Sequence, residues 1–456
     1  MNIVIIGATP MGAVLAKYMV EEGHDVHVVD PDQEAIAQLL THLDVRALQG
    51  SMQDPAILDE VHIHAADLVL VVTHSDTNNI VTALGLHSLA PRARVAILVR
   101  DEQFTANAHI WNSAQLEQVV QLTPEQNAIH LVMELLEIPL AFEVASFLEG
   151  RIHIAGFLLH EDSPLIGKKL CDLDKSQENR TLVVAVDRHN KTIIPTGDFV
   201  FAVRDRLYIP LLAGRKLSDA FEFMGLEQSL LLKQKTHYLI GGGGCMALQL
   251  ASQLEAEGLR VTLIEKDRQR GVALVDRLSK TRVLHGDVTD PVLLQEMIDP
   301  TTTYIALTGN QEINFMSSVL VRRLGAKRAI TLFDNEGYIA ISAFMGVDAA
   351  IHPKFTTIGQ VMTLLRPQEV LEAQLMLGGK LEAQLVKVGP DSPLVGKPLR
   401  LVGLPKGVVV AARQREGQLV LPDGTTVFHS GDQVLLISDR QDKVRRKMRQ
   451  LTFMER

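Results

Sequence analysis

The sequence predicts an α/β protein of four domains, in which two doubly wound parallel sheets are each followed by a small α+β domain. Three observations support this prediction. A strand, a glycine-containing turn, a helix, a second strand and an acid occur in this order twice. Short, continuously apolar strands alternate with helices, as a parallel sheet buried on both faces requires. Matching motifs also recur about 230 residues apart, which indicates a tandem duplication.

The clearer of the two turns follows the apolar run that ends at Ile240. Its spacing Gly242-x-Gly244-x-x-Ala247 fits the fingerprint of a Rossmann-like dinucleotide-binding unit. In that unit the first glycine allows a tight turn, and the second lets the backbone approach a pyrophosphate. Glu265 follows Gly242 by 23 positions and ends the next strand, where such an acid contacts ribose hydroxyls. The candidate cofactor-binding residues of this turn are Gly242, Gly243, Gly244, Cys245, Met246 and Ala247.

The other turn opens the chain and consists of Gly7, Ala8, Thr9, Pro10, Met11 and Gly12. Asp30 follows Gly7 by the same 23 positions and is the candidate ribose acid of this copy. Thr9 stands where the second fingerprint glycine belongs, which would place a β-branched side chain against the phosphates, and Pro10 lacks an N–H donor. We therefore expect the second copy to bind nucleotides more tightly. Both acids should disfavour NADP, whose 2′-phosphate would face a carboxylate.

Ligands of doubly wound sheets bind beyond the carboxyl ends of the strands. Further candidates at those ends are Ser51, Met52, Thr73 and Arg100 in the first half and Asp287, Val288 and Thr308 in the second. Arg100 fits either a surface ion pair or a contact with a nucleotide phosphate or a neighbouring subunit, and the sequence leaves these alternatives open. Asp334 stands near the equivalent position of the second half, so the contact made by Arg100 is not duplicated.

The repeated motifs set the expected domain boundaries. Asp162 to Lys168 reads DSPLIGK, and Asp391 to Lys397 reads DSPLVGK at an offset of 229 residues. Short β-like pieces with Gly, Pro and Asp punctuation surround both motifs, which is typical of a small α+β domain. We expect nucleotide-binding domains at 1–140 and 236–368, small α+β domains at 141–225 and 369–456, and a connector at 226–235.

Composition and the absence of other motifs exclude several functions. The net charge is −9, and the only dense basic run is Lys443-x-Arg445-Arg446-Lys447, so nucleic acid is not expected as a partner. Two cysteines far apart indicate a reducing compartment and no closed metal site. No apolar run is long enough to span a bilayer. The glycine-rich turn at 242–247 lacks the Lys-Ser/Thr ending of a P-loop, which argues against an NTPase.

The motifs GATPMG, GSMQDP, THSDTNN and DSPLIGK, with their copies IGGGGCMA, GDVTDP, TGNQEIN and DSPLVGK, resemble the tandem RCK family, most closely the TrkA-type regulators of bacterial Trk potassium uptake. The resemblance implies RCK-N domains that bind NAD(H) or adenine nucleotides (ATP/ADP), with Ser51-Met52 and Asp287-Val288 in the segment at the adenine edge. It implies RCK-C domains that bind further ligands or pack between subunits. It also implies a homo-oligomeric ring, of two or four chains, beneath a membrane channel subunit on the cytoplasmic face of the inner membrane.

Three functions follow from these observations. The favoured one is a nucleotide-binding regulatory subunit of a Trk-type potassium uptake system, which is not an enzyme. An NAD-dependent oxidoreductase is the first alternative, but it would need a proton donor or acceptor near the nicotinamide, and no His, Lys or Tyr recurs in both copies at such a place. A nucleotide-sensing scaffold for another membrane transporter is the second alternative.

Overall fold

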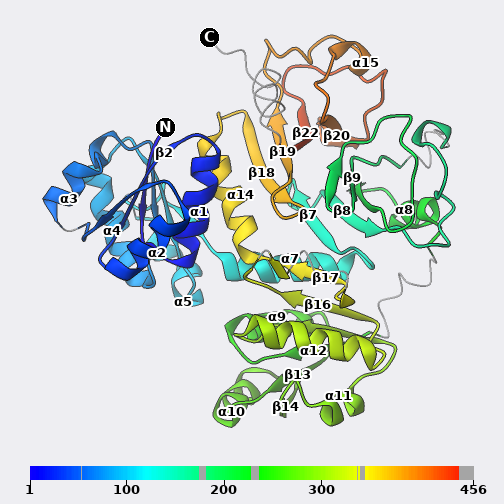
Figure 1. The fold of residues 1–456 in the computed structure, drawn as a ribbon, viewed down its shortest axis with the longest axis horizontal. Coiled ribbons are helices and arrows are strands. Elements are labelled where there is room, and N and C mark those ends of the chain that lie inside the picture. Colours follow the sequence, from blue (N-terminus) through cyan, green and yellow to red (C-terminus); the bar gives the residue numbers. More distant parts are fainter. Residues whose placement is uncertain are drawn as a thin grey trace. The chain divides into compact units, whose positions relative to one another are not determined.

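The computed structural model describes residues 1–52, 54–113, 115–173, 181–226, 236–335, 337–338, 342 and 345–440. The basic run at 443–447 and all but the first residue of the expected connector lie outside these ranges. Contacts divide the chain into two compact units. Unit 1 contains Met1–Asn127 and Thr356–Pro367, and unit 2 contains Ala128–Phe355 and Gln368–Arg456. Each unit holds one parallel sheet (Figure 1).

The sheet of unit 1 has the strand order β3-β2-β1-β4-β5-β6, and every neighbouring pair is parallel. Its strands are β1 (Asn2–Ile6), β2 (Asp25–Asp30), β3 (Arg46–Gln49), β4 (Leu68–Val71), β5 (Arg94–Leu98) and β6 (Val120–Leu122). Its helices are α1 (Pro10–Glu21), α2 (Gln33–His42), α3 (Pro55–Glu60), α4 (Asp76–Leu89), α5 (Glu102–Thr105) and α6 (Ala108–Trp111). Strands β1 and β4 lie at the centre of the sheet, and all of their residues except Asn2 are apolar and buried. The predicted doubly wound sheet is confirmed.

The parallel sheet of unit 2 repeats this topology as β14-β13-β12-β15-β16-β17. Its strands are β12 (His237–Gly241), β13 (Arg260–Glu265), β14 (Arg282–His285), β15 (Thr302–Ala306), β16 (Arg328–Leu332) and β17 (Ala349–Ile351). Its helices are α9 (Cys245–Ala256), α10 (Arg268–Arg277), α11 (Pro291–Met297) and α12 (Gln311–Arg323). The N-terminal helix caps also recur in the two sheets. The side chain of Ser75 accepts a hydrogen bond from the N–H of Asn78 at the start of α4, and the side chain of Asn310 accepts one from the N–H of Ile313 at the start of α12.

Unit 2 also contains two antiparallel five-stranded sheets, with the orders β10-β9-β11-β8-β7 and β18-β19-β22-β20-β21. The first comprises β7 (Glu143–Phe147), β8 (Ile152–Leu158), β9 (Ala185–Arg188), β10 (Lys191–Ile193) and β11 (Arg206–Leu212), followed by α8 (Leu217–Met224). The second comprises β18 (Val370–Met376), β19 (Leu381–Lys387), β20 (Val408–Arg415), β21 (Gln418–Val420) and β22 (Gln433–Asp439), with α15 (Leu399–Val402). These sheets are the two predicted α+β modules.

The two antiparallel sheets pack on each other through reciprocal contacts. The N–H of Leu377 donates to Glu143 Oε1 at 2.8 Å, and the N–H of Leu148 donates to Glu372 Oε1 at 3.0 Å. These pairs are equivalent under the offset of 229 residues, so the two copies use the same surface toward each other. One hydrophobic cluster, which includes Phe147 and Ile437, also spans both sheets. The duplication therefore produces an internal pair with approximate two-fold symmetry.

Helices α7 (Pro124–Glu137) and α14 (Pro353–Leu365) are exchanged between the halves of the sequence. From Ala128 onward, α7 belongs to unit 2, whereas from Thr356 onward α14 belongs to unit 1 (Figure 1). An arginine that opens the fifth strand of each sheet holds the exchanged helix. Arg94 donates to the carbonyl of Leu364 in α14, and Arg328 donates to the carbonyl of Leu135 in α7. The sequence patterns did not predict this exchange.

Replacing Arg328 by Met should destabilise unit 2 strongly. Arg328 is buried and also donates to the carbonyl of Ala141, so the change leaves two carbonyls without their donor. The free energy of unfolding should fall by about 3 to 5 kcal/mol, because a buried charged contact is broken. Chemical denaturation followed by circular dichroism measures the loss. Lys327→Met, which changes the exposed neighbouring residue, should stay within about 0.5 kcal/mol of the parent; equal losses for both variants would contradict this account.

Candidate functional site

In doubly wound sheets the ligand crevice lies where the strand order reverses, which is between β1 and β4 in unit 1 and between β12 and β15 in unit 2. The first glycine of each turn lies directly against the neighbouring strand end. A Cβ added at Gly7 would lie 2.8 Å from the carbonyl oxygen of Val72, and one added at Gly242 would lie 2.8 Å from that of Leu307. Both glycines have positive φ, 114° and 100°. Only glycine allows this backbone to form at this distance from the strand.

The two candidate ribose acids hold these turns in place. Asp30 accepts the N–H of Ala8 at 2.7 Å, and Glu265 accepts the N–H of Gly243 at 2.6 Å. The second oxygen of each carboxylate accepts an N–H two residues later in the chain, at 2.8 Å and 2.6 Å. The end of the second strand is thus tied to the turn in both copies. Each carboxylate keeps lone pairs that a ribose hydroxyl can use.

The side chain of Thr9 does not point toward the phosphate position, as the sequence had suggested. Its hydroxyl donates to the carbonyl of Val72 at 2.8 Å and accepts the N–H of Gly12 at 3.2 Å, and the residue is 3% exposed. The side chain is therefore the N-cap of α1 and is directed toward β4. The expected crowding of a phosphate by Thr9 is wrong for this reason. Pro10 is the first residue of α1 and still removes one N–H from the turn.

Gly244, the counterpart of Thr9, is not required by the fold. Its φ and ψ of −72° and −178° are extended and open to any residue. A Cβ added there would meet no atom within 4 Å. The space in front of Gly244 is open, and helix α9 begins there without a side-chain cap, so its first N–H groups can bind an anion.

A threonine and an asparagine form the second wall of each crevice. Asn79 accepts from both the hydroxyl and the N–H of Thr73, at 2.5 and 3.1 Å. Asn314 accepts from the same groups of Thr308, at 2.6 and 2.8 Å. Both asparagines are buried and also donate to the carbonyl that ends the next strand. They were not among the candidate site residues, although their recurrence at an offset of 235 residues was a usable signal.

The segments after the third strands differ between the copies. Asp287 accepts from Lys266 at 2.8 Å and from the hydroxyl of Thr289 at 2.7 Å, and these hydrogen bonds lower its pKa to about 2. Asp287 is therefore ionised at neutral pH and forms an ion pair with Lys266. In the first copy its place is taken by Ser51, which carries no charge. Met52 and Val288 pack toward the cores beneath these segments.

Arg100 lies beside Thr73, just past the end of β4. It follows β5, and its guanidinium donates to the carbonyl of Thr73 at 3.3 Å. Carboxylates of Asp76 and Glu125 lie 3.9 Å from it, and its side chain is 34% exposed. Both alternatives from the sequence are compatible with this position, since the ion pairs leave guanidinium donors at the crevice.

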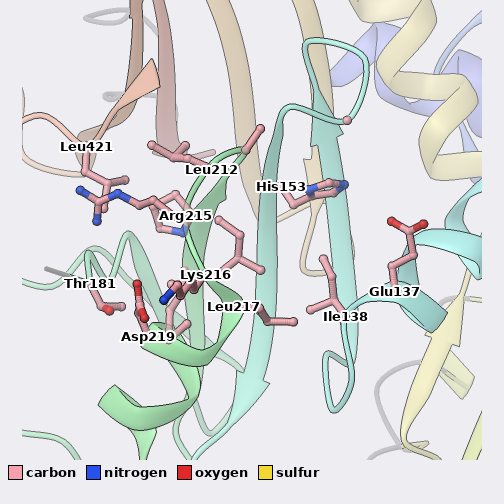
Figure 2. A pocket seen from close by; sticks show the side chains of 16 residues that line it. Glu137, Ile138, His153, Thr181, Leu212, Arg215, Lys216, Leu217, Asp219 and Leu421 are labelled. Carbon is pink, nitrogen blue, oxygen red and sulfur yellow. The ribbon is translucent and has the colours of Figure 1, made fainter. Parts of the chain in front are cut away.

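The remaining turn residues divide between the core and the surface. Met11, Gly12 and Ala247 are buried beneath the turns, Met246 packs against the core, and Cys245 is exposed at the start of α9. Unit 2 also contains a cavity of about 200 Å³, bordered by Ile138, His153 and Arg215 (Figure 2). None of the candidate site residues lines this cavity. It is separate from the nucleotide crevice of that unit.

Two Rossmann-like sheets with glycine turns, each joined to an antiparallel module, define a tandem ligand-binding protein. The TrkA-N domain model matches residues 3–122 and 238–353, and the TrkA-C domain model matches 154–209 and 384–449. The chain belongs to the TrkA family of Trk system potassium uptake proteins.

Relatives of full length support this assignment. The chain is 30% identical to the Trk system potassium uptake protein TrkA of Halomonas elongata, over 98% of this chain and 97% of the relative. It is also 30% identical to that of Azorhizobium caulinodans, over 97% of each. The crystal structure of the GsuK RCK domain has a TM-score of 0.60 at 18% identity and covers 99% of this chain and 94% of that chain. The GsuK channel bound to NAD has a TM-score of 0.59 at 17% identity, covering 99% and 78%. The predicted family, fold class and tandem organisation are confirmed.

His352, which follows β17 and lies close to Asp334 and Lys354, should make the protein sensitive to acid. Burial and then Lys354 lower its pKa from 6.5 to about 4, so the folded state favours the neutral ring. The resulting stability is present above pH 6.5 and is lost as the pH falls toward 4. The shift corresponds to roughly 3 kcal/mol. Urea unfolding at pH 7 and pH 4.5 gives the free energy of unfolding, and its difference between the two pH values should be smaller for His352→Gln than for the parent. The control variant His42→Gln, at an exposed position, should show the same difference as the parent. A difference in His352→Gln equal to that of the parent would contradict the assignment.

Proposed function

We propose that the protein is the nucleotide-binding regulatory subunit of a Trk-type potassium uptake system and controls potassium flux through a membrane partner. The observation that carries the proposal is the pair of glycine turns, each fixed by an acid at the end of the next strand, with open space before the uncapped helix α9 in the second copy. Relatives over the full length are named as Trk system potassium uptake proteins. Among the described residues, no helix is long and apolar enough to cross a membrane, so the flux pathway is assigned to a partner.

The residues of the crevices fit NAD(H) and the adenine nucleotides ATP and ADP. The glycine turns would bind the pyrophosphate, and Asp30 and Glu265 would accept from the ribose hydroxyls. Gly244 supports this assignment most directly, because neither its backbone nor its protein neighbours require a glycine. The GsuK channel, which shares the fold, has been solved bound to NAD. For NAD(H), the second site is the tighter one, since its turn keeps the N–H that Pro10 removes from the first.

The regulatory role requires that nucleotide binding favours one of two conformations, without chemical turnover. We assign the protein to the cytoplasmic face of the inner membrane, as a homo-oligomeric ring of two or four chains bound to a Trk-type channel subunit. The four-domain boundaries given above belong to this proposal. The internal pair of antiparallel sheets supports it, because the two small modules of one chain already pair through the same surface.

Gly244→Val should weaken NADH binding and leave the fold intact. The added side chain enters open space that the pyrophosphate would occupy, so affinity at the second site should fall at least tenfold. Calorimetry gives the affinity, and thermal unfolding gives the stability. Gly389→Val, which also enters open space but in the second antiparallel module, should bind NADH as the parent does. If Gly244→Val bound NADH as tightly as the parent, the turn could not be part of the binding site.

Potassium flux through the reconstituted membrane partner should respond to NADH, NAD or ATP without consuming them. A coupling of about 1 to 3 kcal/mol would change the flux-competent population by roughly 5-fold to 150-fold. Flux measured in proteoliposomes, with product analysis of the nucleotide, tests this. Identical flux with and without saturating nucleotide would contradict a regulatory role, and formation of NAD from NADH would favour an oxidoreductase.

A further inference from the structure

The cavity of unit 2 belongs mainly to the first antiparallel module. It is bordered by the C-terminal end of α7, by β8 and β11, and by the first turn of α8 (Figure 2). Its apolar wall includes Ile138, Ile209 and Ala220, which are all buried. Leu421, which follows β21 of the second module, also borders the cavity, so a bound molecule would contact both modules. Its volume of about 200 Å³ is below that of pockets for drug-sized ligands, which limits the occupant to a small molecule.

Charged side chains of opposite sign line the two sides of this cavity (Figure 2). At the start of α8 are two cations, Arg215 and Lys216, and one carboxylate, Asp219, so this side has a net charge of +1. At the end of α7, Glu137 contributes one negative charge beside His153. Burial lowers the pKa of His153, so its ring is neutral near neutral pH. The lining therefore has no net charge, but its charges are separated.

A second carboxylate lies behind His153. The side chain of Glu134 is 5% exposed, and its Oε1 lies 3.8 Å from His153 Nε2 and 3.1 Å from His130 Nε2. The hydrogen bond with Glu134 raises the pKa of His130, and a protonated His130 balances the charge of Glu134. Because Glu137 remains, the side of the cavity at α7 is negative in either protonation state of His130. This side favours a cationic group.

The backbone at the start of α8 adds to the positive charge of the other side. Lys216 is the N-cap of α8, and no side chain caps this helix, so the N–H groups of its first turn lack a side-chain partner. The helix dipole places partial positive charge at the same end. This side therefore favours a carboxylate or another small anionic group.

The fold shared by the two copies does not require these charges. At an offset of 229 residues, the second copy has Arg366 in place of Glu137 and Glu382 in place of His153. Helix α14, the counterpart of α7, belongs to unit 1 from Thr356 onward, whereas α7 borders the cavity within unit 2. The charge arrangement is therefore a feature of the first copy alone.

We propose that this cavity binds a small zwitterion whose ammonium and carboxylate groups are separated by a short aliphatic chain. The carboxylate lies at the start of α8 near Lys216, and the ammonium lies near Glu137 and His153. The aliphatic chain packs on Ile138 and Ile209. A simple anion or a simple cation satisfies only one side of the cavity. An α-amino acid carries both charges on one carbon, so an ω-amino acid fits the separated charges better.

Calorimetry of the full-length protein with δ-aminovalerate, valerate and pentylamine tests the proposal. The three probes have similar aliphatic chains and carry both charges, the carboxylate alone or the ammonium alone. The parent should bind δ-aminovalerate at least roughly tenfold more tightly than either of the other probes, because only δ-aminovalerate satisfies both sides.

Variants of the two charged sides locate the binding site. Lys216→Gln and Glu137→Gln should each weaken δ-aminovalerate binding by roughly threefold to tenfold, a modest effect because both side chains are exposed. Glu137→Gln should reduce the preference for δ-aminovalerate over valerate, and Lys216→Gln should reduce its preference over pentylamine. Glu222→Gln, which changes an exposed carboxylate of α8 outside the cavity, should match the parent with all three probes.

Two results would overturn the proposal. One is equal binding of the three probes by the parent, or no binding of δ-aminovalerate. The other is an unchanged affinity for δ-aminovalerate in both Lys216→Gln and Glu137→Gln. Both positions are exposed, so the variants should fold, and circular dichroism checks this. If a variant does not fold, the comparison of the three probes on the parent decides alone. Neither result bears on NADH binding, which Gly244→Val tests separately.

Discussion

The exchange of α7 and α14 is the constraint on which the rest of the structure depends. Each helix leaves one parallel sheet and packs on the other, and its C-terminal carbonyls are held by an arginine that opens the fifth strand of that sheet. Arg328 is buried, and burial lowers its pKa to about 10. A buried cation of this kind is stable only where the carbonyls satisfy it, so the contact fixes the position of the helix closely. Helix α7 in turn leads into β7, the first strand of the first antiparallel sheet.

A continuous core connects the parts of unit 2. One hydrophobic cluster includes Val132 of α7, Phe157 and Phe221 of the first antiparallel module, and Ile240 and Leu263 of the second parallel sheet. Packed interiors resist gradual deformation, so a change at the turn after β12 would pass to the antiparallel modules through shifts of whole elements. This arrangement is suited to a protein that responds to a ligand by changing conformation.

Duplication makes the differences between copies informative. The glycine–strand approach, the acid that holds the turn and the buried asparagine are the same in both halves, because they form the crevice itself. The copies differ at three pairs of the candidate site positions: Thr9 against Gly244, Ser51 against Asp287, and Arg100 against Asp334. The first of these differences changes the cap of the helix, because Thr9 caps α1 whereas α9 begins without a side-chain cap.

The sequence by itself determined the two sheets, the tandem duplication, the turns and their acids, because each depends on local periodicity and on spacing within one βαβ unit. It did not determine where Thr9 points, since the hydroxyl's partner, the carbonyl of Val72, lies 63 residues away. It also could not show that α7 and α14 exchange sheets, because an amphipathic helix carries no signal of which apolar surface will bury it. Only the tertiary structure decides such contacts, since they depend on which distant groups satisfy one another's hydrogen bonds and exclude water.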